Sequence, residues 1–191
     1  MTSAVHIDSP PAHALRTWTR EEFERLIGFG LFGDEKLELL EGNIITMSPQ
    51  GIVHASVNQL LTKRFVRALG DRAEVRVQLP FAAGDLSRPE PDVAIVPPGD
   101  YVNALPTLAY LLVEVAESSL DFDRTTKARL YAACNIPEYW IINLVNDTVE
   151  VYTEPLHGDY GSKRTYRQDE RIGLSALSGI GFDVNELLPQ R

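Results

Sequence analysis

A single glutamate, Glu114, lies in the most apolar stretch of the chain, 110–116 (YLLVEVA), and Lys127 follows thirteen residues later. Asp92 directly precedes a second apolar run, 93–96 (VAIV). Charged side chains in such surroundings are costly unless they are paired with an opposite charge or bound to a metal. Carboxylates that hold a divalent cation, together with a nearby lysine, can hydrolyse a phosphodiester. The spacing therefore predicts a metal-dependent phosphodiesterase site.

The surroundings of Glu114 make this interpretation specific. Alternation along a strand places Glu114 on the same face as Tyr110, Leu112 and Ala116. Both faces of the predicted strand are otherwise apolar, so we expect it to be central in a sheet. An unpaired carboxylate there would take up a proton, and a bound cation would keep it ionised. The alternative is a glutamate at the end of the sheet, paired with a cationic side chain.

Lys127 lies in a helix that we predict over 124–134. At helical spacing it shares one stripe with three less polar side chains, Leu130, Tyr131 and Cys134. Lys127 is therefore expected to point toward the sheet, although its long side chain could instead reach the surface. Asp123, one turn earlier, could cap the helix or pair with Lys127, and we favour the cap.

Asp92 is expected at the start of a strand over 92–96. Two prolines in the preceding segment, 88–91 (RPEP), hold the chain extended. If this strand lies beside 110–116, a strand spacing of about 4.8 Å lets Asp92 and Glu114 bind one cation. Two carboxylates with water and phosphate oxygens are a common way to hold Mg²⁺. The alternative is a turn aspartate that accepts backbone hydrogen bonds.

These residues need a scaffold, and the remaining pattern predicts one of mixed class. Capping-box spacing at Thr19–Glu22 starts a short helix, and Asp183 is a candidate cap for a last one. A longer helix is predicted over 52–69, with an apolar stripe of Val53, Val57, Leu60, Leu61 and Val66. Two hairpins are predicted, one at 37–47 with its turn at 41–43 and one that joins 138–144 to 148–152. Further strands are predicted at 74–81, 163–167 and 171–174.

Strands outnumber helices in this pattern, and short turns join many neighbours. We therefore expect an α/β (α+β) fold, with a mixed, partly antiparallel sheet core flanked by helices and additional antiparallel hairpins. The chain of 191 residues is long enough for one domain. We predict a loose N-terminal tail over 1–16 and a single domain over 17–191.

The composition limits partners and compartment. The net charge of -9 counts against broad, non-specific nucleic-acid binding but not against a locally basic groove. Cys134 is the only cysteine, which excludes an intrachain disulfide and favours a reducing compartment. The start of the chain lacks the apolar segment of a signal peptide, and no apolar run reaches the length of a membrane span. We expect a cytoplasmic protein without a membrane partner.

Together the motifs resemble the PD-(D/E)xK nuclease superfamily, and more closely the large bacterial family called putative restriction-endonuclease domains, formerly a domain of unknown function. The matching stretches are 37–49 (LELLEGNIITMSP), His54, 91–96 (PDVAIV), 113–115 (VEV), Asp123, Lys127 and 131–142 (YAACNIPEYWII). The resemblance runs from about Thr17 to Leu188, and the last of these stretches is its most specific part.

The resemblance implies roles for the site residues. Asp92 matches the aspartate of the first motif and Glu114 the acid of the second, both as metal ligands for Mg²⁺, with Mn²⁺ as a substitute. The superfamily's lysine stands two residues after the acid, where this chain has Ala116. The resemblance places the lysine in the following helix instead, at Lys127. Glu38 is a candidate for an additional acid, although an exposed hairpin glutamate explains it as well.

Further residues are assigned more loosely. His54 either lines the site or has a structural role at a helix start. Asn135 stands where the family often has glycine, and asparagine tolerates the same backbone conformation. Candidate substrate contacts are the cations Lys63, Arg64 and Arg67 of the long helix, and Arg88 beside the site.

The function implied by the resemblance is that of a Mg²⁺-dependent endodeoxyribonuclease with a restriction-endonuclease-like fold, and DNA as its substrate. One alternative is a catalytically silent, dimeric binding module of the same fold, associated with DNA or mobile elements. Another is a purely structural ion pair between Glu114 and Lys127. We expect a homodimer, because 139–140 and Tyr152 could offer aromatic surface, although strand aromatics are more often core. Nothing in the sequence indicates a methyltransferase partner.

Overall fold

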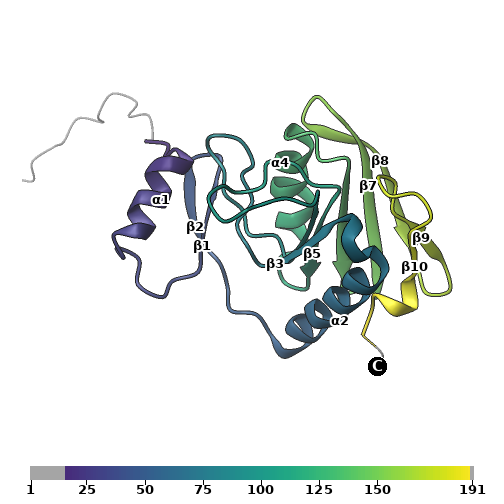
Figure 1. Cartoon of the computed structure of the whole chain (residues 1–191). Helices are drawn as coiled ribbons and strands as arrows, with labels where there is room; N and C mark the ends of the chain where they lie inside the picture. The colour runs from purple at the N-terminus through teal and green to yellow at the C-terminus, as the bar shows by residue number, and fades with distance from the viewer. Residues whose placement is uncertain (1–15, 190–191) are drawn as a thin grey trace, which may run out of the picture.

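A six-stranded mixed sheet forms the centre of the computed structural model, which describes residues 16–189 (Figure 1). Its strands are β3 (Glu74–Val77), β4 (Val93–Val96), β5 (Leu111–Ala116), β6 (Glu138–Asn143), β7 (Thr148–Leu156) and β8 (Asp159–Tyr166). They lie side by side in chain order. Strands β5 and β6 are parallel, and the other neighbouring pairs are antiparallel. The predicted mixed sheet is confirmed.

Helices cover both faces of this sheet. Helix α2 (Ile52–Leu69) packs on one face through Val57, Leu61, Phe65 and Leu69. A continuous helical segment packs on the other face and consists of α3 (Leu120–Phe122), the π-helical turn η2 (Asp123–Lys127) and α4 (Ala128–Ala133). Figure 1 shows α2 and α4 on opposite sides of the strands. Because parallel neighbours need a crossover connection, this second segment is what joins β5 to β6.

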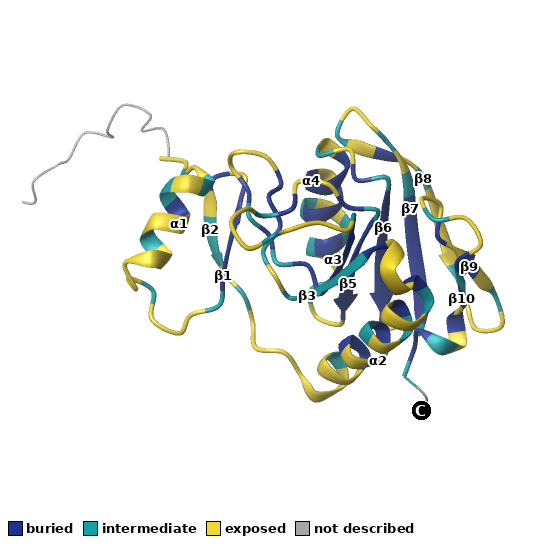
Figure 2. Cartoon of the chain, in the orientation of Figure 1, coloured by how far each residue is buried: buried dark blue, intermediate teal, exposed yellow. Residues whose placement is uncertain are grey.

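Burial explains why the central strands read as nearly continuous apolar runs. Every residue of β4, β5 and β6 is buried, and Figure 2 shows β5 and β6 in dark blue. A strand that is covered on both faces gains from apolar side chains at each position. Glu114 is therefore an exception within a strand whose other five residues are apolar and buried.

A second layer attaches to the sheet near the N-terminus. It contains α1 (Arg20–Gly28) and the hairpin of β1 (Leu37–Leu40) with β2 (Asn43–Thr46), which share a small core. The capping box of α1 is confirmed by reciprocal bonds between Thr19 and Glu22. At the hairpin turn, Glu41 and Gly42 both have positive φ, 50° and 78°. A Cβ at position 42 would lie 2.5 Å from the Cβ of Thr17, so only glycine fits this turn.

The hairpin is joined to the loop that leads into β4. Leu39 and Arg88 exchange backbone hydrogen bonds, at 3.4 and 2.6 Å. This bridge matters for the site because it brings the neighbouring Glu38 close to the start of β4.

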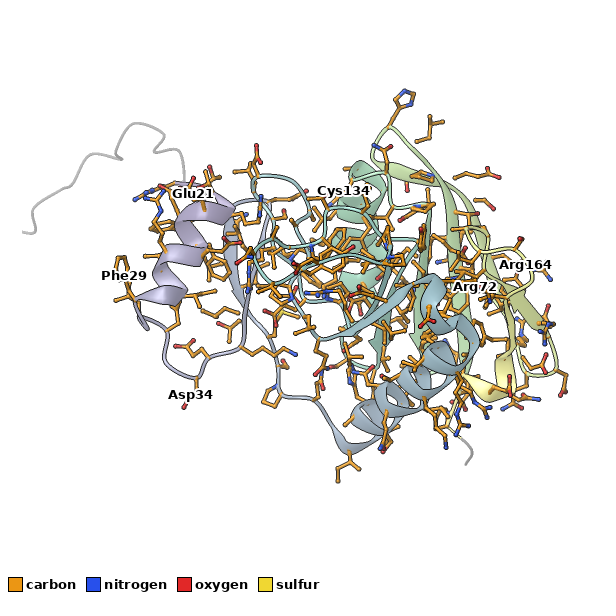
Figure 3. The ribbon with its side chains drawn as sticks, in the orientation of Figure 1. Glu21, Phe29, Asp34, Arg72, Cys134 and Arg164 are labelled. Atoms are coloured by element: carbon orange, nitrogen blue, oxygen red, sulfur yellow. The ribbon has the colours of Figure 1, made fainter. Side chains whose placement is uncertain are left out.

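The remaining elements are short. They are the 3-10 turns η1 (Gly70–Arg72) and η3 (Val184–Glu186) and the antiparallel pair β9 (Arg171–Gly173) and β10 (Gly181–Asp183). Asp183 does precede η3, but its side chain makes no cap hydrogen bond. Side chains at the ends of elements are seen in Figure 3, where Phe29 points outward beyond α1 and Cys134 lies at the end of α4.

Several sequence predictions need correction. Strand β3 ends at Val77 rather than at 81, because Gln78 adopts a positive φ of 51° and its N–H turns to the carbonyls of Pro91 and Asp92. On α2, Val53 and Val66 are exposed, while Asn58 and Phe65 are buried. The stripe that faces the sheet is thus rotated from the predicted one.

The aromatic surface proposed for a homodimer is also wrong. Tyr139 and Trp140 are fully buried and Tyr152 is 6% exposed, so all three belong to the core. The homodimer itself stays a prediction. The predicted tail over 1–16 lies outside the described residues except for Arg16, which pairs with Glu22. Among the described helices, none is long and apolar enough to cross a membrane.

Candidate active site

The predicted site residues meet in one cavity of about 290 Å³. It opens where β5 ends and β4 begins, between the sheet, the β1–β2 hairpin and the start of α2. Its lining includes Glu38, His54, Asp92, Glu114 and Lys127. All five candidates from the sequence are therefore brought together.

Strand register places the two principal carboxylates next to each other. Strands β4 and β5 pair Val93 with Val113 in antiparallel register, so the next step along both strands brings Asp92 beside Glu114. The backbone N–H of Val115 donates to Oδ2 of Asp92 at 2.8 Å, which fixes the aspartate against β5. The condition that these two strands are neighbours is therefore met.

Asp92 is held as an ionised carboxylate by a dense set of donors. Its Oδ1 accepts hydrogen bonds from the amides of Gln50, Asn58 and Gln78, at 3.2, 3.0 and 3.1 Å. Its Oδ2 lies 3.0 Å from Nε2 of His54. Burial alone would raise the pKa of Asp92, but His54, Asn58 and the Val115 N–H overcome it and lower the pKa.

Glu114 is the centre of a buried ion-pair network that reaches into the helical segment 120–133. Its Oε1 accepts from Nζ of Lys127 at 2.9 Å and from the Tyr131 hydroxyl at 2.8 Å. Lys127 is only 2% exposed, so it does not reach the surface, and the prediction that it points toward the sheet is confirmed. Both bonds go to a single oxygen, and no described side chain donates to Oε2.

Glu38 joins this network from the hairpin. It is 1% exposed, which rules out the alternative of an exposed hairpin glutamate. Its two carboxylate oxygens each lie 3.3 Å from Nζ of Lys127, and Oε1 also accepts from the Glu90 N–H. Oε2 is buried and lacks a hydrogen bond from any described residue.

Asp123 corrects the sequence interpretation. It lies inside the helical segment, within the π-helical turn η2, and is not the N-cap of a helix. A wider π turn places Asp123 and Lys127 on the same buried side, and such turns often occur at functional sites. The Ser119 hydroxyl donates to Asp123 at 2.6 Å. Burial raises the pKa of Asp123 to about 6, although Lys127 and Ser119 oppose the shift.

The charges in the cavity do not balance. The carboxylates of Glu38, Asp92, Glu114 and Asp123 surround it, and Lys127 is the buried cation among them. Burial raises the pKa of Glu114 well above its ordinary value, and the nearby carboxylates add to this effect while Lys127 opposes it. Lys127 in turn has a raised pKa, because its carboxylate neighbours outweigh its burial. The site thus holds an excess of acid groups that compete for protons.

The donor set can be compared with the needs of a metal. In the described part of the chain, no group of three or more histidine, cysteine or acidic side chains is arranged to hold a metal ion. The neighbouring pair Asp92 and Glu114, with the orphaned Oε2 of Glu38 nearby, still suits an ion that takes few protein ligands and keeps its waters. Mg²⁺ is such an ion, so the residues fit it.

Some functional residues escaped prediction. Gln50, Asn58 and Gln78 come from three separate segments and meet only at Asp92. Asn58 does carry a signal, because it interrupts the apolar side of α2. Tyr131 lies on the predicted stripe of Lys127, and that position could have identified it.

The predicted substrate contacts fall into two classes. Arg64 pairs with Glu186 at 3.0 Å, and Arg88 pairs with Glu90 at 3.0 Å. Lys63 and Arg67 are exposed on α2 and form no ion pair with any described residue. Lys63 and Arg67 can therefore bind an anionic ligand without breaking an ion pair of the protein, whereas Arg64 and Arg88 cannot.

Comparison with known proteins finds one family model and a solved structure that are similar to this chain. The model of the family Uma2, described as "putative restriction endonuclease", matches residues 20–185. The crystal structure of "a putative nuclease belonging to DUF820" from Anabaena variabilis ATCC 29413 is similar, with a TM-score of 0.68 and 19% sequence identity. The alignment covers 88% of this chain and 96% of that one, and at this identity it shows the shared fold. No curated protein matches the chain.

Proposed function

Because the chain belongs to the Uma2 family of restriction-endonuclease-like proteins, we propose that it is a Mg²⁺-dependent endonuclease that hydrolyses phosphodiester bonds of DNA. The observation that carries this proposal is the placement of Asp92 and Glu114 side by side at the cavity, with Lys127 bonded to Glu114. Two neighbouring carboxylates and a lysine match the chemistry that phosphoryl transfer requires.

The side chains have distinct roles in this proposal. Asp92 and Glu114 hold the metal, which when bound would polarise the phosphate and lower the pKa of water. The amides of Gln50, Asn58 and Gln78 fix the Asp92 carboxylate, so its lone pairs are shared between these donors and the metal. With His54 and the Val115 N–H, Asp92 already has five polar contacts, and a carboxylate has about four acceptor positions, so a metal would have to replace at least one of them.

Lys127 acts beside the reacting phosphate. Its ammonium group stays charged because of its acidic neighbours, and it would orient water or stabilise the charge that develops on the phosphoryl oxygens. Tyr131 and Glu38 keep Lys127 and Glu114 in place. His54 contacts Oδ2 of Asp92, and this is the contact that we expect a bound metal to replace.

A structural ion pair is the competing account, and the 2.9 Å contact between Lys127 and Glu114 favours it. A satisfied pair needs no metal, so this account predicts little affinity for Mg²⁺. Calorimetric titration with Mg²⁺ or Mn²⁺ therefore separates the two accounts without any nucleic acid.

Replacing Asp92 tests the proposal directly. We expect the wild type to nick supercoiled plasmid only when Mg²⁺ or Mn²⁺ is present, and Asp92→Asn to lose at least about 100-fold in rate, because it removes a metal-binding charge. Asp71→Asn, which changes an exposed aspartate in η1, is the matched control and should cleave like the wild type. Circular dichroism would verify that both variants fold. Unchanged cleavage by folded Asp92→Asn would remove the proposed site.

A further inference from the structure

A second cavity lies on the other side of Asp92, between α2 and the edge strand β3. Its volume is about 660 Å³. The side chains that matter for its chemistry are Asn58, Lys63, Val66, Arg67, Val77 and Gln78. Within the described residues 16–189, strand β3 pairs only with β4, so this cavity borders an open edge of the central sheet.

The charge of this cavity differs from that of the rest of the chain. Lys63 and Arg67 stand one helical turn apart on α2, and both are exposed. Neither forms an ion pair within residues 16–189, and no carboxylate lines the cavity. By contrast, the adjacent cation Arg64 is paired with Glu186. In a chain with a net charge of -9, two unpaired cations in a cavity without acids form a local site for an anion.

The second cavity is connected to the candidate active site through polar side chains. Gln50 lines both cavities. Asn58 and Gln78 line the second one, and each donates a hydrogen bond to Asp92. A ligand in the second cavity would therefore lie next to the groups that hold the catalytic aspartate.

We propose that this cavity binds the sugar-phosphate backbone of the DNA strand next to the bond that is cleaved, with Lys63 and Arg67 contacting its phosphates. The proposal rests on the endonuclease function proposed above, since it takes the strand to continue from the site at Asp92. Amide side chains and the apolar surfaces of Val66 and Val77 suit sugars and bases between the phosphates. An acidic partner protein would meet the same two cations but would have no reason to extend to Asp92.

The experiment measures DNA binding separately from cleavage. Binding of a fluorescein-labelled duplex oligonucleotide is followed by anisotropy in EDTA over a range of salt concentrations. Each phosphate contact contributes about 0.9 to the slope of log affinity against log salt. We expect Lys63→Ala/Arg67→Ala to bind more weakly than the wild type and to reduce this slope by about 2.

A matched control removes two charges elsewhere. Arg129 on α4 and Arg167 after β8 are exposed, and neither lines the second cavity. Arg129→Ala/Arg167→Ala should therefore keep the slope of the wild type. An equal slope for wild type and Lys63→Ala/Arg67→Ala, an equal decrease in both double variants, or an absence of wild-type binding would overturn the inference.

Cleavage assays keep the two proposals distinguishable. If the endonuclease proposal holds, Lys63→Ala/Arg67→Ala should raise KM for DNA while kcat stays close to that of the wild type. Binding that depends on Lys63 and Arg67 without metal-dependent cleavage would support this cavity and reject the endonuclease. Metal-dependent cleavage by the wild type, with a KM and a salt slope that are unchanged in Lys63→Ala/Arg67→Ala, would support the endonuclease and reject this cavity.

Discussion

At the scale of single residues, the site depends on charges that are buried together. Glu114 and Lys127 are 4% and 2% exposed, and their bond satisfies one carboxylate oxygen. Asp123 adds a further acid on the same side, and its pKa is raised to about 6 by burial. A buried acid with a raised pKa costs folding free energy once it ionises.

Asp123 gives a prediction for stability against pH. Its ordinary pKa is 3.8 and its pKa in the fold is about 6, so the folded state binds the proton more tightly. Its contribution is fully present below about pH 4 and is lost as the pH rises through 6. Relative to the wild type, Asp123→Asn should therefore gain roughly 2 kcal/mol between pH 4 and pH 7. Urea unfolding at both pH values measures this, and a difference that is independent of pH would contradict it.

Residue types and their apolar surroundings predicted that Asp92, Glu114 and Lys127 lie together, and the structure brings all three to one cavity. The cap assigned to Asp123 was wrong because a π-helical turn leaves no mark in the spacing of side chains. The donors to Asp92 were missed for another reason. Three amides from separate segments converge only after folding, and amides in polar segments are not unusual by themselves.

At the scale of elements, the π-helical turn is fixed to the sheet by a second ion-pair cluster. Arg124 of η2 donates to Glu150 of β7, which also accepts from Lys163 of β8 and Asn143 of β6. Glu150 is 2% exposed. The cluster lies in the same turn as Lys127 and therefore helps to hold the helical segment against the strands.

Glu150→Gln is expected to weaken this attachment. Burial alone would raise the pKa of Glu150, but bonds from Arg124, Lys163 and Asn143 lower it to about 2. Its stabilising effect is present above its ordinary pKa of 4.5 and is lost as the pH falls toward 2. The variant should lose roughly 2–3 kcal/mol at pH 7, and less at pH 3. Denaturant unfolding at both values tests this, and an equal loss at both would show that the charge is not responsible.

Element boundaries were predicted best where one local signal decides them. The capping box of α1 and the glycine turn between β1 and β2 are such signals, and both are confirmed. The end of β3 was not predictable, because it depends on hydrogen bonds of Gln78 to a distant loop. The buried face of α2 differs from the predicted apolar stripe because it includes Asn58, whose amide donates a hydrogen bond to Asp92.

At the scale of the whole molecule, the proposed metal site would link metal binding to folding. A ligand that binds only the folded state stabilises it in proportion to the logarithm of its concentration. Protons would compete with the metal for Glu114, because the pKa of this proposed ligand is raised. The stabilisation by metal and its weakening by protons should both be visible in the melting temperature.

We expect MgCl₂ to raise the melting temperature more at pH 8 than at pH 5. Differential scanning calorimetry of the wild type with increasing MgCl₂ at both pH values measures this, with NaCl of equal ionic strength as the control. A larger increase at pH 5, or an equal increase with NaCl, would contradict specific binding by these carboxylates.

The fold class followed from the sequence because strand and helix patterns are local. The pairing of β4 with β5 was only a condition in the sequence analysis, and the structure meets it. The order of the outer strands and the second cavity did not, because they depend on how distant segments pack. The cytoplasmic location stays a prediction.

The most direct test of the central claim is metal-dependent cleavage of supercoiled plasmid by Glu114→Gln compared with the wild type. The glutamine carbonyl can still accept the bonds from Lys127 and Tyr131, so the fold is kept while a metal-binding charge is removed. The account predicts nicking by the wild type that requires Mg²⁺ or Mn²⁺ and falls at least about 100-fold in the variant. Equal nicking by both folded proteins would contradict it.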